Sequence, residues 1–552
     1  MHRFFSGMRT ALDGSDARRA YAAEEREIYD ASTPVEIDPA FRARMEELAH
    51  AREDRLALGA SARDPRLRIW LRTAEVAKEG HALVLGTSGA GKTRAVAGVA
   101  RQLLERIAHN PDAQGLVVLD HKGELVAIVR RLMRALLETL PPAQAARLLD
   151  RLVIVNPFAE AALVPLQILR RERREDPELV ALEAATVIDR LGGAQLGVNQ
   201  DAFLYHALLL GVDRGLSLPV IADRLADLGG FTTLAASSSL PAVRTFFGGE
   251  RRLSDASLQG VRARLHRLCR MPSARLMLGA RDALSFYELL RSRIVLIDLG
   301  SPPFGCEDLG AFWAGILTLK LTRAIFQRTE ADARRPVTLL VDEWQEGIAA
   351  AGNAQHYARV LSVARSRAVS LVLISQSLAG AARVEATLPE VVATNTSVQL
   401  LFRASSADAR SMAHLLPVTG RRHRPPTAPW EERPRTPFLD RQAEREALVA
   451  EIPSLPQRTF YFWNRHHSPR AELVRALDVN LPQVRWRDAR TEWLLEHGAL
   501  ARPIAELEAN LHAGEVAEPP LFRPRREVPV PERPPPQPPA DAPTRRPARR
   551  GR

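Results

Sequence analysis

Eight consecutive residues have the types and spacing needed to hold a chain of phosphate groups. They match the pattern G-x-x-x-x-G-K-[ST] in full: Gly86, Thr87, Ser88, Gly89, Ala90, Gly91, Lys92 and Thr93. Glycines let backbone N–H groups surround phosphate oxygens at the start of a helix. We expect Lys92 to reach the β- and γ-phosphates and the Thr93 hydroxyl to bind Mg²⁺. The segment therefore predicts ATP and Mg²⁺ as cofactors.

An acidic pair ends the apolar run from Val337 to Val341. Asp342 and Glu343 follow it directly. We expect Asp342 to bind Mg²⁺ through water, and Glu343 to polarise the water that attacks the terminal phosphate. A solvated turn would contain the same residue types, but the phosphate-binding segment upstream favours the catalytic interpretation.

Two further polar residues flank the apolar run Ser370–Ile374. Gln376 follows the run, where it can sense the γ-phosphate or orient water; a hydrogen bond to a nearby loop is the alternative. Arg365 ends the predicted helix before the run. A fixed cation there can stabilise phosphoryl transfer in the next subunit of a ring. A solvated surface arginine is the alternative for Arg365 in a chain so rich in arginine.

A third polar segment, Asp120-His-Lys-Gly-Glu124, follows another apolar run. It contains Lys122, one of only four lysines in the chain. The segment also matches the D-x-x-G of GTP-binding proteins. The chain has no N-K-x-D sequence for guanine recognition, so ATP remains the predicted nucleotide.

The elements that must position these residues are short apolar runs separated by amphipathic stretches. We predict buried strands at 81–85, 115–120, 151–155, 293–298, 337–342, 370–374, 398–402 and 459–463. Strands that alternate with helices indicate a parallel sheet covered on both faces. The predicted fold class is α/β, a RecA-like P-loop NTPase with a mostly parallel sheet. Only helices are expected between residues 170 and 285, so an inserted all-α domain interrupts the sheet.

The sequence is predicted to form six parts. A charged N-terminal segment at 1–65, without a transmembrane helix, is expected to be partly helical, for example from Pro39 to Leu58. The nucleotide-binding domain occupies 66–169 and 286–475, on either side of the insertion at 170–285. A helical appendage is predicted at 476–518. A disordered Pro/Arg-rich tail is predicted at 519–552.

Bulk composition narrows the class of protein. The chain has 552 residues, 46% hydrophobic and 26% charged, with a net charge of +12. A basic balance suits a polyanionic partner, although proteins with neutral partners also carry such charge. Two cysteines without C-x-x-C spacing indicate neither a metal site nor a disulfide framework, which fits a reducing cytoplasm. We find no run of roughly 18 apolar residues, the length needed to cross a bilayer.

The order of the motifs resembles a known family. GTSGAGKT, VVLDHKGEL, a helical insertion, LLVDEW and VARSRAVSLVLISQS follow one another, and VQLLFRASSADARSMAHLL comes after them. Together they resemble the type IV secretion coupling proteins of bacterial conjugation, the TraD/TraG group, within the FtsK/HerA class of DNA-pumping ATPases. The resemblance covers roughly Leu67 to Arg475.

The resemblance implies an ATP-hydrolysing DNA translocase that works as a homo-hexameric ring, with relaxase or secretion-channel proteins as partners. It also implies that the helical insertion helps to select substrate. Members of the group usually begin with transmembrane helices. None is predicted here, so we expect a cytoplasmic protein, at most peripheral at the inner membrane. The alternatives are an ATPase that engages protein substrates for secretion without pumping DNA, and a regulatory NTPase switch.

Overall fold

We describe the protein from a computed structural model. The described residues are 37–51, 55–72, 80–110, 114–172, 175–191, 195–249, 255–280, 284–300, 302–304, 307–351, 354–419, 422, 439–481 and 487–516. The predicted tail at 519–552 lies outside these residues, as do the first 36 residues of the predicted N-terminal segment.

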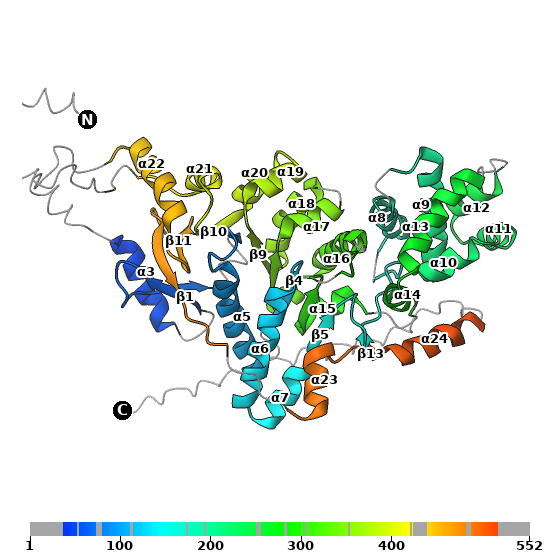
Figure 1. Ribbon diagram of the computed structural model, residues 1–552, viewed down its shortest axis with the longest axis horizontal. Helices are drawn as coiled ribbons and strands as arrows, with labels where there is room; N and C mark the ends of the chain where they lie inside the picture. The colour runs from blue at the N-terminus through cyan, green and yellow to red at the C-terminus, as the bar shows by residue number, and fades with distance from the viewer. Residues whose placement is uncertain are drawn as a thin grey trace, which may run out of the picture.

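A large sheet forms the centre of the molecule (Figure 1). Its seven parallel strands run, in spatial order, β10 (Thr396–Phe402), β3 (His81–Leu85), β9 (Val369–Ser375), β8 (Val337–Asp342), β4 (Gly115–Asp120), β7 (Ile294–Asp298) and β5 (Leu152–Val155). Most of their residues are apolar, because helices cover both faces of a parallel sheet. The predicted α/β fold with a mostly parallel sheet is therefore confirmed.

Four antiparallel strands extend the sheet beyond β10. They are β11 (Thr459–Asn464), β12 (Glu472–Ala476), β1 (Arg55–Ser61) and β2 (Arg68–Arg72). The prediction of helix as far as Leu58 was wrong: α3 (Pro39–His50) ends earlier, and β1 begins at Arg55. Gly59 marks a close approach of two backbones, because a Cβ there would lie 2.1 Å from the carbonyl oxygen of Arg475 on β12. The missing side chain lets β12 pair closely with β1.

Two hydrophobic cores lie on the two faces of the sheet. Val117 and Leu119 of β4 point into one core, and Leu116 and Val118 point into the other. The second core also contains α3, α5 (Lys92–His109), α6 (Glu124–Thr139) and α7 (Pro142–Leu149). The first core contains α15 (Phe286–Ser292), α16 (Glu307–Gln327), α17 (Trp344–Ala351), α18 (Ala354–Ser366), α19 (Leu378–Val384), α20 (Leu388–Asn395), α21 (Ser406–Leu415) and α22 (Arg441–Glu451).

Among the described residues, every element between β6 (Ala162–Leu163) and α15 is a helix. They are α8 (Pro177–Asp189), α9 (Val198–Arg214), α10 (Leu218–Arg224), α11 (Leu228–Ala236), α12 (Pro241–Gly248), α13 (Asp255–Cys269) and α14 (Pro272–Gly279). They gather to one side of the sheet, at the right of Figure 1. Their apolar side chains are continuous with the first core.

The long helix α16 connects these helices to the sheet. It packs against α8, α15, α17 and α18. The buried guanidinium of Arg323 on α16 pairs with Glu175 (3.3 Å) and with Glu183 of α8 (2.8 Å). By length and composition α16 is the one helix among the described residues that could cross a membrane. However, 78% of its apolar 18-residue stretch is buried inside the protein. Its place in the core accounts for its apolar sequence.

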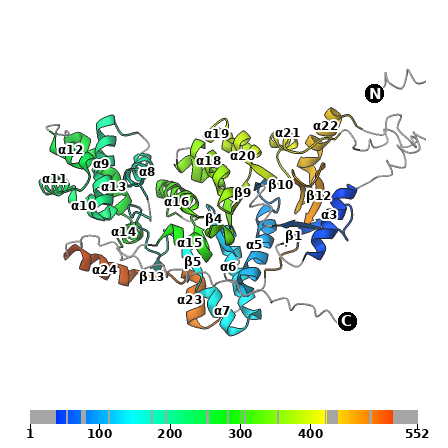
Figure 2. The same ribbon diagram turned by 180° about the vertical axis from the view of Figure 1, so that it is seen from behind.

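The last described segment runs along the end of the sheet. Helix α23 (Ala489–His497) packs on β5 and α6, and the N–H of Ala499 donates to the carbonyl of Leu152 (2.7 Å). Strand β13 (Arg502–Pro503) pairs with β6, and α24 (Ile504–Val516) then packs against α14 (Figure 2). We call residues 498–516 the C-terminal strap. It joins the edge of the sheet to the helical segment.

Candidate nucleotide site

The predicted site residues other than Arg365 meet at the carboxyl edge of the parallel strands. The phosphate-binding loop follows β3, Gln376 follows β9, Asp342 ends β8 and Asp120 ends β4. These four strands are direct neighbours in the order β3-β9-β8-β4, and Asp120 pairs in register with Asp342. A cavity of about 430 Å³ opens there. It is lined by Ser88, Gly89, Gly91, Lys92, Thr93, Arg94, Lys122, Glu124, Ile128, Asp342, Glu343, Gln376 and Gln457.

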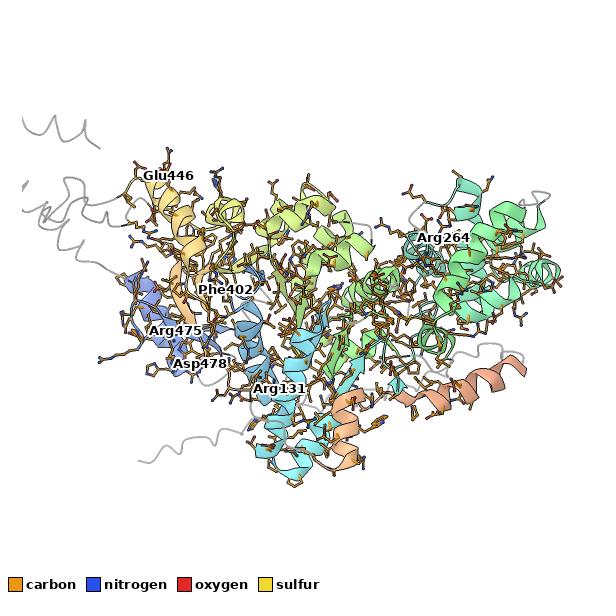
Figure 3. The ribbon with its side chains drawn as sticks, viewed as in Figure 1. Arg131, Arg264, Phe402, Glu446, Arg475 and Asp478 are labelled. Carbon is orange, nitrogen blue, oxygen red and sulfur yellow. The ribbon has the colours of Figure 1, made fainter. Side chains whose placement is uncertain are left out.

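The phosphate-binding loop has the backbone shape that its glycines predict. Gly89 (φ 74°) and Gly91 (φ 104°) adopt left-handed conformations that other residues rarely take. A Cβ on Gly86 would lie 2.6 Å from the Cβ of Phe402, the last residue of β10 (Figure 3). The Lys92 ammonium donates to the carbonyls of Gly86 (2.5 Å) and Thr87 (3.1 Å). The loop is therefore wrapped around its own lysine.

A turn far along the sequence braces this loop, and the sequence analysis missed it. The N–H of Arg458 donates to the carbonyl of Ala90 (2.8 Å), and the Gln457 amide donates to the carbonyl of Gly89 (3.0 Å). Arg458 has a left-handed backbone (φ 66°), and a Cβ on Gly91 would lie 2.7 Å from its Cγ. No motif marks this turn; its one signal is its position directly before a predicted strand.

Asp342 lies where a divalent cation would stabilise it. Burial raises its pKa to about 7, and the neighbouring carboxylates of Asp120 and Glu343 add to the shift. In the described residues no group of three or more His, Cys, Asp or Glu side chains forms a metal cage. One hydroxyl and one carboxylate fit Mg²⁺ bound to a nucleotide, because Mg²⁺ keeps several waters and binds phosphate oxygens beside one or two protein ligands. The Thr93 hydroxyl and Asp342 are those protein ligands in the predicted site.

Glu343 is held by three side chains. Its Oε1 is paired with the Lys122 ammonium and accepts from the Gln376 amide (2.8 Å), while Oε2 accepts from the Gln345 amide (2.8 Å). Its backbone is left-handed (φ 47°), which is uncommon outside glycine and is found at functional sites. Burial acts to raise the pKa of Glu343, but the hydrogen bonds from Lys122, Gln345 and Gln376 and the charge of Lys122 together outweigh burial and lower the pKa. The structure thus brings Glu343 and Gln376 into direct contact.

Arg365 does not join this group within one chain. It is exposed at the end of α18, which enters β9 at the edge opposite the cavity. The seven residues of β9 separate it from Gln376, a length of roughly 20 Å. Arg367 lies at the same far edge, where its carbonyl accepts from Arg328 (3.0 Å). Neither arginine reaches the cavity of its own chain.

Comparison with known proteins identifies the fold. No protein-family model matches the sequence, and no curated protein matches it. The bacterial conjugative coupling protein TrwBdeltaN70 is 16% identical with a TM-score of 0.50, covering 79% of this chain and 92% of that one. The chain has the fold of a conjugative coupling protein. VirB4 of Thermoanaerobacter pseudethanolicus is 12% identical with a TM-score of 0.50, covering 77% of this chain and 96% of that one. The resemblance to coupling proteins is confirmed at the level of the fold.

Proposed function

We propose that the protein is an ATP-hydrolysing motor of the coupling-protein type that moves DNA through a ring. The observation that carries the proposal is the junction of four strand ends in one cavity, where Lys92, Asp342, Glu343 and Gln376 meet. A fold shared with TrwB over most of both chains supports the same class of motor.

The side chains divide the chemistry of phosphoryl transfer between them. Lys92 neutralises the transferred phosphate, and Thr93 and Asp342 would hold the Mg²⁺, which would supply further neutralisation of phosphate charge. Glu343 accepts a hydrogen bond from the attacking water, and Gln376, already bonded to Glu343, orients that water. Positioning and charge neutralisation supply most of the rate in this reaction, because the phosphoryl group itself forms few new covalent bonds in the transition state.

DNA is the proposed substrate because the chain is basic overall, with a net charge of +12, and because TrwB is a conjugative coupling protein. In this proposal the helical segment at 170–285 is a domain inserted between the two parts of the motor, and it selects the substrate. Its helices cluster beside the sheet and are connected to it through α16.

The test is ATP turnover by the full chain with and without DNA. We expect single- or double-stranded DNA to raise turnover several-fold in the wild type, and no turnover from Lys92→Ala under any condition. Stimulation by secreted proteins but not by DNA would support the alternative, an ATPase that engages protein substrates. Absence of ATP hydrolysis in the wild type would refute the proposed motor function.

The proposed ring gives Arg365 a role in the neighbouring subunit. Because Arg365 is exposed and distant from its own cavity, it can act only on a nucleotide held by another copy. An arginine supplied in this way contributes roughly 10³ to 10⁵ in rate. Turnover per subunit should then rise with protein concentration as rings assemble.

Mixing two inactive variants tests the ring directly. Arg365→Ala keeps an intact phosphate-binding loop, and Lys92→Ala keeps an intact Arg365. Mixed rings should recover part of the activity, because some interfaces pair the intact halves. Arg359→Ala, an exposed arginine on the same helix, is the control and should stay active. Activity of Arg365→Ala near the wild-type value would refute the role in trans.

A further inference from the structure

The segment Asp120–Glu124 borders the cavity, yet the proposed function gives it no role. Asp120 is fully buried, and its carboxylate accepts from the N–H groups of Lys122 (2.9 Å) and Val126 (2.9 Å). Gly123 adopts φ 78°, so the chain turns sharply into α6. These bonds fix the backbone of the turn from the β4 side.

A second strand end fixes the turn from the other side. A Cβ on Gly300, just after β7, would lie 2.1 Å from the carbonyl carbon of Lys122. The two backbones are therefore packed as closely as glycine allows. The backbone of Lys122 cannot shift, so its long side chain is the part of this segment that can move.

The Lys122 side chain can pair with either of two anions, the Glu343 carboxylate or a phosphate in the cavity. It is 41% exposed, lines the cavity together with Lys92 and Thr93, and pairs with Oε1 of Glu343, whose side chain is 7% exposed. Gln376 donates to the same oxygen. Each carboxylate oxygen accepts about two hydrogen bonds, so Lys122 and Gln376 together occupy Oε1. A water cannot use that oxygen while both donors remain.

We propose that Lys122 is a positioning residue that releases Glu343 when a terminal phosphate enters the cavity. This inference rests on the proposed ATPase function. A terminal phosphate carries close to two negative charges and three strong acceptor oxygens, against one charge on a carboxylate. It draws the ammonium group away from Glu343, and Oε1 becomes available to the attacking water. A diphosphate ends one phosphate short and leaves the Lys122–Glu343 pair in place.

The residue type supports release rather than permanent pairing. The chain uses arginine at almost every basic position and has four lysines. An arginine would grip the carboxylate with two parallel hydrogen bonds, whereas lysine is a point charge on a flexible stem. A group that must exchange one anion for another needs the second property.

A double-mutant cycle on binding tests the proposal in the full chain. Affinities for a non-hydrolysable ATP analogue and for ADP are measured for the wild type, Lys122→Met, Glu343→Gln and the double variant. We expect Lys122→Met to weaken binding of the analogue at least tenfold and binding of ADP less than twofold. We expect Glu343→Gln to tighten binding of the analogue only when Lys122 is present. Arg131→Met, an exposed residue on α6 (Figure 3), is the control and should change neither affinity.

Turnover supplies an independent readout. Lys122→Arg keeps the charge and should lower kcat at least tenfold with little change in KM, because the arginine holds Glu343. Equal effects of Lys122→Met on the analogue and ADP, or kcat of Lys122→Arg near the wild-type value, would overturn the proposal. Failure of the wild type to bind either nucleotide would overturn the ATPase function instead, so the two failures are distinguishable.

Discussion

His81 makes a sharp prediction about how stability depends on pH. It begins β3 and is fully buried. Its Nε2 lies 2.7 Å from the Leu361 carbonyl, and its Nδ1 accepts from the N–H of Leu371 (3.2 Å). An acceptor at Nδ1 must lack a proton, so the ring is neutral with its proton on Nε2. Burial lowers the pKa of His81 from 6.5 to about 4, against the hydrogen bond to Leu361, and nearby Arg365 lowers it further.

The size and sign follow from proton binding. Between pH 6.5 and pH 4 the unfolded chain binds a proton at His81 and the folded chain does not, so stability falls as the pH is lowered through this window. Each pKa unit corresponds to about 1.4 kcal/mol, so the full loss is about 3 kcal/mol. From pH 7 to pH 5 the loss is about 2 kcal/mol.

The assay is urea unfolding at pH 7 and pH 5, followed by tryptophan fluorescence, for the wild type and His81→Gln. The free energy of unfolding should fall by about 2 kcal/mol more in the wild type than in the variant. His109→Gln, at the exposed end of α5, should behave like the wild type. Identical pH dependence in the wild type and His81→Gln, or an NMR titration of His81 near pH 6.5, would refute the reasoning.

Three further predictions follow from the site and the sheet. Lys92→Ala should abolish ATP turnover and keep the wild-type circular dichroism spectrum, because the ammonium bonds only to two loop carbonyls in the structure; near-normal turnover would contradict it. Glu343→Gln should bind ATP and slow its hydrolysis by about 10²-fold or more, and loss of binding in an equilibrium titration would make Glu343 structural instead. Gly59→Ala should lower stability by about 2 kcal/mol in thermal unfolding, since its Cβ meets the Arg475 carbonyl; an unchanged melting temperature would argue against that close contact.

The parallel half of the sheet was predictable because its strands are buried on both faces. A run such as Leu116–Leu119 contains no polar residue, and so few other structures fit it. The antiparallel half was mostly missed. Strand β12 reads Glu-Leu-Val-Arg-Ala, without a regular alternation of polar and apolar residues. The buried carboxylate of Glu472 accepts a hydrogen bond from the distant Ser61 hydroxyl (2.7 Å). A buried carboxylate whose partner lies 411 residues away leaves no local pattern.

The site was predictable where one motif carries the chemistry, and not where two distant segments meet. The phosphate-binding loop follows β3 and Asp342 ends β8, and both lie at the carboxyl edge of the sheet with only β9 between their strands. The ion pair between Lys122 and Glu343 depends on β4 and β8 being neighbours in register, which the sequence order of the strands does not reveal. The turn at Gln457 and Arg458 likewise contacts a loop that lies 368 residues earlier in the chain.

The C-terminal strap has a consequence for biosynthesis. Its residues 498–516 bond to Leu152 on β5, pair with β6 and pack on α14, all of which leave the ribosome hundreds of residues earlier. Until the strap arrives, the outer edge of β5 presents unpaired backbone groups, which invite pairing with other chains. The helical segment likewise lacks its last contact with the end of the sheet. In a nascent chain this edge therefore stays uncovered until residues 498–516 have been synthesised, and termination before residue 498 would expose it permanently.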